Sequence, residues 1–179
     1  MAAVWEVLIV DDESGVRELL AMHLRSQGFV VAEATSGQAA VDAIERDPER
    51  YGLIVTDLQL PGLDGLAVLH AAKSANPSVY VVVITGYATL DSAIQAVRLG
   101  AYDYLPKPFS LGQFDVAVRR VKDRSALEHE NRQLTRRLAP QAAGDSGAAA
   151  FERFDGRLAH IESLLADLLD RFGSTTPPR

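Results

Sequence analysis

The sequence predicts a doubly wound α/β domain with a helical extension at its C-terminal end. Through about residue 120, short apolar runs alternate with longer stretches of helical periodicity. Several of these runs are continuously apolar rather than alternating, which is typical of parallel strands covered on both faces. The length of 179 residues, with 47% hydrophobic and 23% charged residues, suits one buried core and a small appendage.

Five strands are expected, each followed by a helix. The expected strands are residues 7–10, 30–32, 53–56, 79–84 and 102–105. The apolar residues that indicate the first four helices are Val16, Leu19, Leu20 and Leu24, then Ala39, Ala40, Ala43 and Ile44, then Leu66, Leu69 and Ala72, and then Ile94, Val97 and Leu99. Glycine and proline favour helix ends, so Gly28, Gly52, Gly100 and the pair Asn76 and Pro77 are expected where helices stop.

The fifth helix is expected to begin near Leu111 and to continue beyond the domain edge at residue 122. Its first part has three residues that can face the sheet: Phe114, Val118 and Val121. Its second part, residues 123–138, has the alternating spacing of a coiled-coil seam at Leu127, Asn131, Leu134 and Leu138. Pro140 ends this helical extension.

The remaining residues predict a linker, a second amphipathic helix and a tail. Residues 139–150 are small and uncharged apart from Asp145, as in a flexible linker. In 151–173 the apolar residues recur at heptad spacing: Phe151, Phe154, Leu158, Ile161, Leu165, Leu168 and Phe172. Their stripe is wider than a two-stranded seam, which favours a bundle of three or four helices or a docking partner over a helix folded back on its own domain. Residues 174–179 are a frayed tail.

Composition excludes several classes of protein. The chain has no cysteine, so it has no disulfides, zinc–thiolate sites or thiol nucleophiles. No apolar run is long enough to span a membrane and the first residues do not form a secretory signal, so we expect a cytoplasmic protein without membrane attachment. Residues 111–140 have 7 basic and 4 acidic residues, whereas residues 1–110 have 7 and 14. Because only one modest stripe is basic, nucleic acid is not expected to be the main partner.

Polar residues stand where the expected strands end. Asp11 and Asp12 follow the first strand, Asp57 the third, Thr85 the fourth and Lys107 the fifth. Ligands of open α/β sheets bind outside the carboxyl ends of the strands, so we expect these residues to converge on one site.

Three crowded carboxylates require a positive partner. At about 4 Å and an effective dielectric constant near 20, each pair of carboxylates repels by roughly 4 kcal/mol. A site of oxygen ligands suits Mg²⁺, which takes one or two carboxylates together with water and phosphate oxygens. The Thr85 hydroxyl and the Lys107 ammonium are groups that hold phosphoryl oxygens. The pattern indicates a phosphoryl-transfer site with a carboxylate as nucleophile.

Four motifs together resemble the receiver domain of bacterial two-component response regulators. They are VDDE at 10–13, DLQLPGLDG at 57–65, ITG at 84–86 and YDYLPKPF at 102–109. The resemblance covers residues 5 to about 122, and the residues at 86–89 and 100–104 are most similar to the nitrogen-regulatory, sigma-54-activator branch. It implies a receiver domain at 1–122 with a flavodoxin-like, five-stranded parallel sheet in the order 2-1-3-4-5.

The resemblance also implies a reaction and a cofactor. Asp57 is implied as the phosphoacceptor, which attacks the phosphohistidine of a sensor kinase or phosphotransfer protein. Asp11 and Asp12 are implied to hold Mg²⁺, helped by Asp57 and the backbone carbonyl of Gln59. The chain is then no enzyme beyond the self-catalysed phosphorylation and dephosphorylation of its own Asp57.

A conformational switch is implied in the same way. Lys107 pairs with the phosphoryl group and Thr85 moves to hydrogen-bond it, while Tyr104 turns inward. The Lys107–Pro108 bond is expected to be cis. Taken singly, four residues also have ordinary interpretations: Asp11 as a helix cap, Asp64 as a loop or cap residue, Thr85 as a strand terminus and Tyr104 as a half-buried packing residue. The four histidines are all on expected helices and receive no phosphotransfer role.

The sequence favours one output over two alternatives. The chain has no G-x-x-x-x-G-K-[S/T] loop and only one expected helix after Pro140, so we expect output through protein–protein contacts, with a downstream protein target and self-association through 151–173. The alternative is a DNA-binding regulator that uses the basic stripe at 119–137: Arg119, Arg120, Lys122, Arg124, Arg132, Arg136 and Arg137. A phosphatase similar to the haloacid dehalogenases would need a second aspartate where Gln59 stands.

Overall fold

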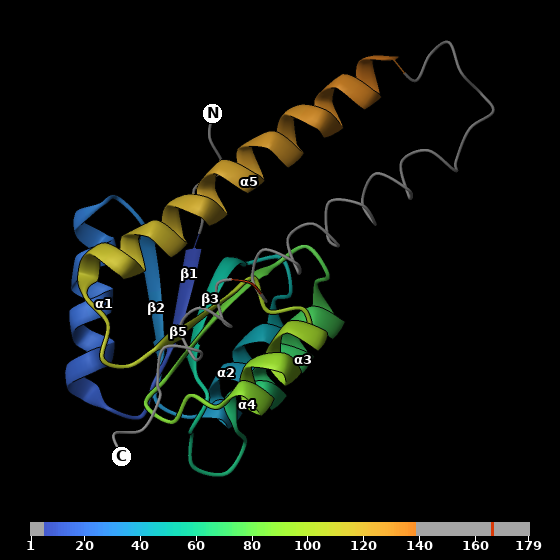
Figure 1. Ribbon diagram of the computed structural model, residues 1–179. Coiled ribbons are helices and arrows are strands. Elements are labelled where there is room, and N and C mark those ends of the chain that lie inside the picture. The colour runs from blue at the N-terminus through green and yellow to red at the C-terminus, as the bar shows by residue number, and fades with distance from the viewer. Residues whose placement is uncertain (1–5, 139–165, 167–179) are drawn as a thin grey trace. The chain divides into compact units, whose positions relative to one another are not determined.

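The computed structural model describes residues 6–138 and Ala166 (Figure 1). The chain divides into two compact units, with the boundary between Phe114 and Asp115. The predicted linker at 139–150, the amphipathic helix at 151–173 and the tail at 174–179 lie outside the described residues, except for Ala166, which is helical. The structures predicted for these three segments therefore remain predictions.

Five strands form one parallel sheet in the order β2-β1-β3-β4-β5, as predicted. The strands are β1 (Glu6–Val10), β2 (Val30–Ala34), β3 (Tyr51–Asp57), β4 (Tyr80–Thr85) and β5 (Asp103–Pro106). Strand order reverses at β1, because the chain moves from β1 outward to β2 and then back across to β3. This reversal opens a crevice at the carboxyl ends of β1 and β3, where ligands of doubly wound sheets bind.

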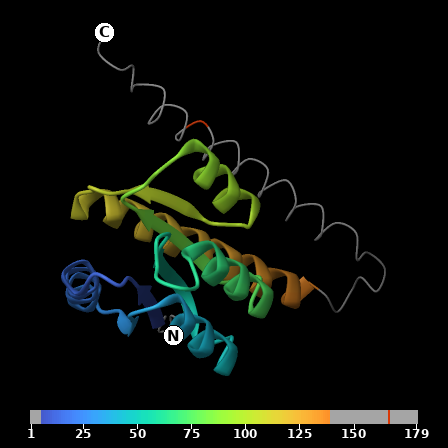
Figure 2. The same cartoon turned by 90° about the horizontal axis from the view of Figure 1, so that it is seen from below.

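Four helices connect the strands: α1 (Ser14–Ser26), α2 (Gly37–Arg46), α3 (Gly65–Ala75) and α4 (Leu90–Arg98). A further helix, α5 (Leu111–Leu138), follows β5. In Figures 1 and 2, α1 lies on one side of the sheet and α2, α3 and α4 lie on the other. The central strands are therefore shielded from water on both faces.

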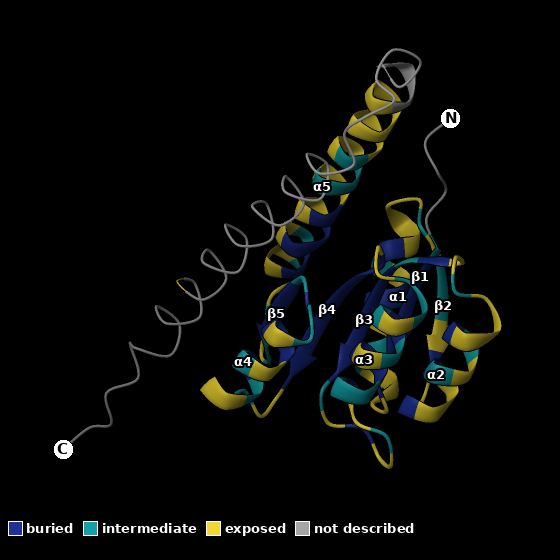
Figure 3. Ribbon diagram, turned by 90° about the vertical axis from the view of Figure 1, so that its right-hand side faces the viewer, coloured by how far each residue is buried: buried dark blue, intermediate teal, exposed yellow. Residues whose placement is uncertain are grey.

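Burial follows from this layering (Figure 3). All six residues of β4 are buried, and so are six of the seven residues of β3. The edge strand β2 buries only Ala34. The continuously apolar runs of the sequence are the central strands, and burial of their side chains supplies the main free energy that stabilises the sheet.

One local expectation was wrong. Gly52 was expected to end a helix, but it is the second residue of β3, because α2 ends six residues earlier at Arg46. Leu19, one of the apolar residues that indicated α1, is 48% exposed, whereas Leu20 and Leu24 are buried. A residue one position from Leu20 is turned about 100° around the helix.

Helix α5 is continuous over 28 residues, as the apolar pattern predicted. Phe114, Val118 and Val121 are buried. Further along, Leu127 is 57% and Leu134 is 47% exposed, so the first part of the predicted seam is open to solvent in the single chain. No helix among the described residues is both long enough and apolar enough to cross a membrane.

Candidate functional site

The carboxyl ends of four parallel strands place the candidate residues side by side. Asp57 and Thr85 are the last residues of β3 and β4, whereas Asp11 and Lys107 directly follow β1 and β5. The register aligns Val10 with Thr56, Asp57 with Ile84 and Thr85 with Pro106. The parallel sheet therefore brings four residues that are distant in the sequence to the same edge, as expected.

Lys107 is the centre of this arrangement. Its Nζ atom lies 2.6 Å from Oδ2 of Asp57, 2.9 Å from Oδ2 of Asp11 and 3.3 Å from Oε1 of Glu13. The side chains of Asp11 and Asp57 are 0% and 7% exposed, whereas that of Glu13 is 65% exposed. One ammonium group thus offsets part of the repulsion between two buried carboxylates, and the remaining charge of the cluster is negative.

The pKa values of the buried pair reflect both burial and pairing. Burial raises the pKa of Asp11 from its ordinary value, and the hydrogen bond from Lys107 only partly opposes this rise. Burial also disfavours the charged form of Lys107, but hydrogen bonds to Asp57 and Asp11 outweigh it and raise the Lys107 pKa above its ordinary value. Lys107 is therefore a permanent cation at neutral pH.

The two buried aspartates are held in the same way. In each, one carboxylate oxygen accepts from Lys107 and the other accepts from a backbone N–H two residues later. The N–H of Gln59 lies 2.9 Å from Oδ1 of Asp57, and the N–H of Glu13 lies 2.9 Å from Oδ1 of Asp11. Both carboxylates are oriented before any ligand arrives, which lowers the entropic cost of binding one.

The loop after Asp57 is tightly packed. The N–H of Gly65 donates to the carbonyl of Leu58 at 2.9 Å, and a Cβ atom at Gly65 would lie 2.1 Å from the carbonyl oxygen of Asp57. Asp64 caps α3 by accepting from the N–H of Ala67 at 2.8 Å, which confirms the interpretation of Asp64 as a cap. Helix α3 therefore begins directly against the backbone of Asp57.

The grouped carboxylates differ in one residue from the expected metal ligands. Oxygens of Asp11, Glu13 and Asp57 all lie within 4.8 Å of one another. Asp12 is exposed and does not belong to this group. Residue 13 is the N-cap of α1, where the chain turns, and its side chain reaches Lys107. The sequence contained this signal as a third acidic residue in VDDE, but the direction of the turn was not readable from it.

This donor set fits a hard divalent cation. Three carboxylates offer only oxygen atoms, the ligands that Mg²⁺ prefers. Asp12 and the backbone carbonyl of Gln59 remain predicted ligands, since both lie in the loops that carry Asp11 and Asp57.

The expected switch residues lie on neighbouring strands. Thr85 is fully buried, and its Oγ1 accepts from the N–H of Tyr87 at 3.1 Å. Tyr104 is also fully buried rather than half-buried. The Tyr104 hydroxyl is hydrogen bonded to Ser92 of α4 at 2.8 Å, and burial raises the Tyr104 pKa. The Lys107–Pro108 bond is cis, as expected.

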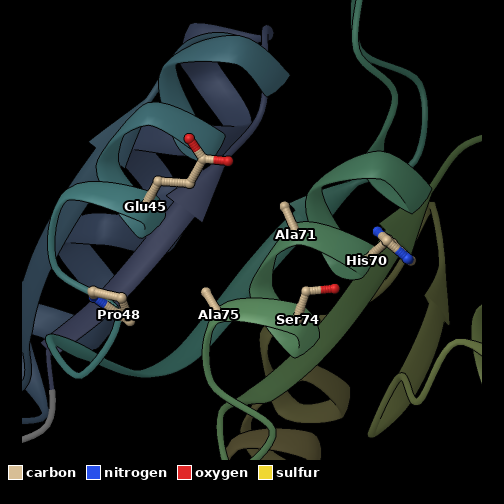
Figure 4. Close-up of a pocket in the computed structure, with 6 residues that line it drawn as sticks. All are labelled: Glu45, Pro48, His70, Ala71, Ser74 and Ala75. Atoms are coloured by element: carbon tan, nitrogen blue, oxygen red, sulfur yellow. The ribbon is translucent and has the colours of Figure 1, made fainter.

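A separate hollow lies between α2 and α3 (Figure 4). Its volume is about 480 Å³. It is lined by Glu45, Pro48, His70, Ala71, Ser74 and Ala75. None of these residues belongs to the site around Lys107.

Comparison with known proteins agrees with the geometry. Residues 7–119 match the family described as the response regulator receiver domain. The C4-dicarboxylate transport transcriptional regulatory protein DctD of Rhizobium meliloti is 30% identical over 94% of this chain and 37% of its own length. The DNA-binding transcriptional regulator NtrC of Klebsiella pneumoniae is 38% identical over 74% of this chain and 27% of its own length. The chain thus spans well under two thirds of either relative.

A solved structure extends the comparison to three dimensions. The response regulator receiver domain protein from Clostridium thermocellum superposes with a TM-score of 0.64 at 28% identity, covering 69% of this chain and 98% of that one. The match over 7–119 includes Asp11, Asp57, Thr85 and Lys107. On sequence, topology and the arrangement of these residues, the chain belongs to the family of response regulator receiver domains.

Proposed function

We propose that this chain is the phosphoacceptor of a two-component system and receives a phosphoryl group on Asp57 from a sensor histidine kinase or a phosphotransfer protein. The observation that carries the proposal is the position of the Asp57 carboxylate, 2.6 Å from the Lys107 ammonium and within 4.8 Å of two further carboxylates. A nucleophile, a fixed cation and an oxygen-rich cation site are the parts that phosphoryl transfer needs.

The transfer step follows from these parts. An oxygen of the Asp57 carboxylate attacks phosphorus, the bond between phosphorus and the donor histidine nitrogen breaks, and its electron pair returns to the imidazole ring. The product is an acyl phosphate on Asp57. Lys107 already donates to Oδ2 of Asp57 and can transfer a hydrogen bond to a phosphoryl oxygen, while the Thr85 hydroxyl supplies another donor.

Mg²⁺ would be held by Asp57 and Asp11 with Glu13 or Asp12, and when bound it supplies positive charge to the transferring phosphoryl group. Lys107 alone does not balance three carboxylates, so the cluster retains the negative charge that favours a divalent cation. The chain acts on no substrate other than its own Asp57 in this proposal.

Phosphorylation by a small donor tests the proposal. With Mg²⁺ and acetyl phosphate, the wild-type chain should gain one phosphoryl group on Asp57, measured by intact mass and peptide mapping. Asp57→Ala should abolish the label, whereas Asp64→Ala, which removes a cap carboxylate on the same loop, should leave it. Labelling that survives Asp57→Ala would exclude this assignment.

Three further variants test the roles of single residues in the cluster. Asp12→Ala and Glu13→Ala compare the two candidate third ligands: the variant that weakens Mg²⁺ binding more identifies the carboxylate that the cation uses. Lys107→Ala should leave Mg²⁺ binding largely intact but uncouple phosphorylation from the movement of Thr85 and Tyr104.

We further propose that output proceeds through protein–protein contacts in the cytoplasm and that the chain self-associates. The exposed Leu127 and Leu134 on α5 support a helix-mediated contact. A pull-down with and without beryllofluoride, which mimics the phosphoryl group, should recover a protein target that depends on the state of Asp57.

DNA binding is the second candidate, because the relative NtrC is named a DNA-binding transcriptional regulator and the basic stripe on α5 is exposed at Arg119 and Arg132. The two outputs differ in salt dependence. About six phosphate contacts would lose roughly 10³ in affinity between about 50 and 200 mM salt, whereas an apolar helix interface would hardly respond.

A further inference from the structure

We propose that Arg17 is a positioning residue for the phosphoacceptor site and fixes the Asp11 loop for cation binding. This inference rests on the proposed function, since it assigns a role within the same site. Arg17 lies on α1, six residues beyond Asp11, and its side chain is only 12% exposed. Its side chain is a cation and is no metal ligand, and among the described residues no hydrogen bond joins it to Asp57.

The Asp11 backbone is held from two sides. Nη1 of Arg17 donates to the carbonyl oxygen of Asp11 at 2.9 Å. The N–H of Asp11 donates to the carbonyl of Ala34 at the end of β2, at 3.3 Å. Helix α1 and strand β2 therefore clamp the peptide groups on both sides of the Asp11 Cα atom, and this clamp sets the direction of its side chain.

Glu33 orients the guanidinium group of Arg17. Its Oε2 lies 3.4 Å from Nε of Arg17, and Glu33 stands beside Ile9 in the sheet. The other oxygen, Oε1, accepts from Nη2 of Arg25 at 2.9 Å, and the same Nη2 also donates to the carbonyl of Val31. A planar guanidinium held at two of its nitrogens has little freedom to rotate away from Asp11.

The orientation matters because Asp11 shares its carboxylate between two partners. Oδ1 accepts from the N–H of Glu13 and Oδ2 accepts from Lys107. Without Arg17, the carbonyl of Asp11 has lost a charge-assisted hydrogen bond and the peptide plane can rotate. The carboxylate oxygens of Asp11, Glu13 and Asp57 would then no longer be held within binding distance of one ion. Loss of such an outer partner typically costs about 10- to 100-fold in metal affinity.

The same helix contains a matched control. Arg25 is also an arginine of α1 and also pairs with Glu33, but it contacts the carbonyl of Val31 instead of that of Asp11. Arg17 is the more buried of the two, with 12% of its side chain exposed against 51% for Arg25. A merely structural role for Arg17, as part of an ion pair between α1 and β2, predicts that the loss of either arginine leaves the Mg²⁺ affinity of the folded protein unchanged. A positioning role predicts that only Arg17 affects the cation.

The experiment compares Arg17→Met with Arg25→Met in the full chain, because methionine keeps the apolar stem and removes every donor. Each variant is titrated with MgCl₂ alone, and the dissociation constant is measured from the amide NMR shift of Gln59. Arg17→Met should weaken Mg²⁺ binding about 10-fold. Arg25→Met should change it less than about twofold, and Arg17→Lys, which can still donate to the Asp11 carbonyl, should recover part of the loss.

Two additional measurements separate positioning from general stability. In the metal-free protein, the Glu13 amide should exchange faster in Arg17→Met than in Arg25→Met, because its acceptor on Asp11 has become mobile. At saturating Mg²⁺, labelling of Arg17→Met by acetyl phosphate should return to within roughly threefold of the wild-type rate.

Equal Mg²⁺ affinities in the two methionine variants, with a wild-type chain that binds Mg²⁺ and is labelled on Asp57, would overturn the role of Arg17 and leave the proposed function standing. A wild-type chain that neither binds Mg²⁺ nor accepts a phosphoryl group would overturn both. Loss of Mg²⁺ binding confined to Arg17→Met supports the inference.

Discussion

The hydroxyl oxygen of Tyr104 on β5 lies 2.8 Å from the hydroxyl oxygen of Ser92 in the first turn of α4. Ser92 also forms a capping box with Thr89, because the N–H of Thr89 donates to Oγ of Ser92 and the N–H of Ser92 donates to Oγ1 of Thr89, both at 3.1 Å. One hydroxyl group therefore links the buried aromatic ring of the expected switch to the N-terminal cap of α4.

Removal of Ser92 should loosen the start of α4. Ser92→Ala removes the acceptor of the Thr89 N–H and the bond to Tyr104, whereas the backbone N–H of residue 92 still donates to Oγ1 of Thr89. We expect a cost of about 0.5–1 kcal/mol in the free energy of unfolding together with faster amide exchange over residues 90–93. Tyr104→Phe is the control, since it removes the link to Tyr104 and leaves the capping box in place. Equal exchange rates at the start of α4 in the two variants would show that the cap does not depend on Ser92.

Gly65 should be intolerant of any side chain. An added Cβ atom would lie 2.1 Å from the carbonyl oxygen of Asp57 and 2.8 Å from Cα of Leu58, and backbone atoms cannot move aside as a side chain could. Gly65→Ala should therefore lower the free energy of unfolding by about 3 kcal/mol and reduce the labelling of Asp57. Urea denaturation measures the first effect and intact mass the second.

Gly15→Ala is the matched control for Gly65. Both glycines lie in the first turn of a helix, but a Cβ atom at Gly15 meets nothing within 4 Å. Alanine there should stabilise the chain by about 0.5–1 kcal/mol, because it restricts the unfolded state more than glycine does. A loss of stability at Gly15 similar to that at Gly65 would contradict the steric explanation.

At neutral pH, the wild-type protein should be less stable than the variant Asp11→Asn, in which a neutral amide replaces the carboxylate. Burial raises the Asp11 pKa in the folded state above the ordinary value of 3.8, so the ionised carboxylate costs free energy in the fold. Without Mg²⁺, Asp11→Asn should raise the free energy of unfolding on the order of 1 kcal/mol. The gain should shrink as the pH falls toward 3.8, because the wild-type carboxyl group then takes up its proton in the folded state first.

Glu6 provides a control of opposite sign. A hydrogen bond from Arg50 lowers the Glu6 pKa below its ordinary value of 4.5, so the ionised form stabilises the fold. Glu6→Gln should lower the free energy of unfolding at neutral pH, and this loss should fade as the pH falls through the folded-state pKa of Glu6. Urea denaturation at several pH values measures both variants, and slopes of the same sign would contradict the assignment.

The full chain should be at least dimeric at micromolar concentration. A chain that ends at residue 140 retains only the short seam at 127–138. We expect it to be monomeric or weakly dimeric, because the seam spans under two heptads and Asn131 costs stability at a core position. Leu158→Asp with Leu165→Asp, in a segment that lies outside the described residues, should return the full chain to that state. Sedimentation velocity measures each form, and a full chain that stays monomeric with or without phosphorylation would indicate that 151–173 docks on another protein.

The strands and the main site residues could be predicted because the signal for them is local. A continuously apolar run indicates a strand covered on both faces, and a polar residue directly after it must stand at the edge of the sheet. Asp11, Asp57 and Lys107 were located in this way, and the structure places Lys107 in contact with both aspartates.

The contacts between side chains could not be predicted, because they join positions that are distant along the chain. Glu13 rather than Asp12 reaches Lys107 because the backbone turns into α1 at residue 13, a direction that the letters VDDE do not encode.

The sequence by itself determined the order of strands and helices along the chain, the polar residues at the strand ends and the continuation of α5 past residue 122. Only the tertiary structure decided which of the neighbouring acids approach one another, that Tyr104 is bonded to Ser92, and that Arg17 holds the carbonyl of Asp11. Periodicity is a property of successive residues, so it can be recognised from the sequence alone. A hydrogen bond forms only when the donor and acceptor atoms lie within about 3 Å of each other. Only the packing of helices against the sheet brings these donor and acceptor atoms that close.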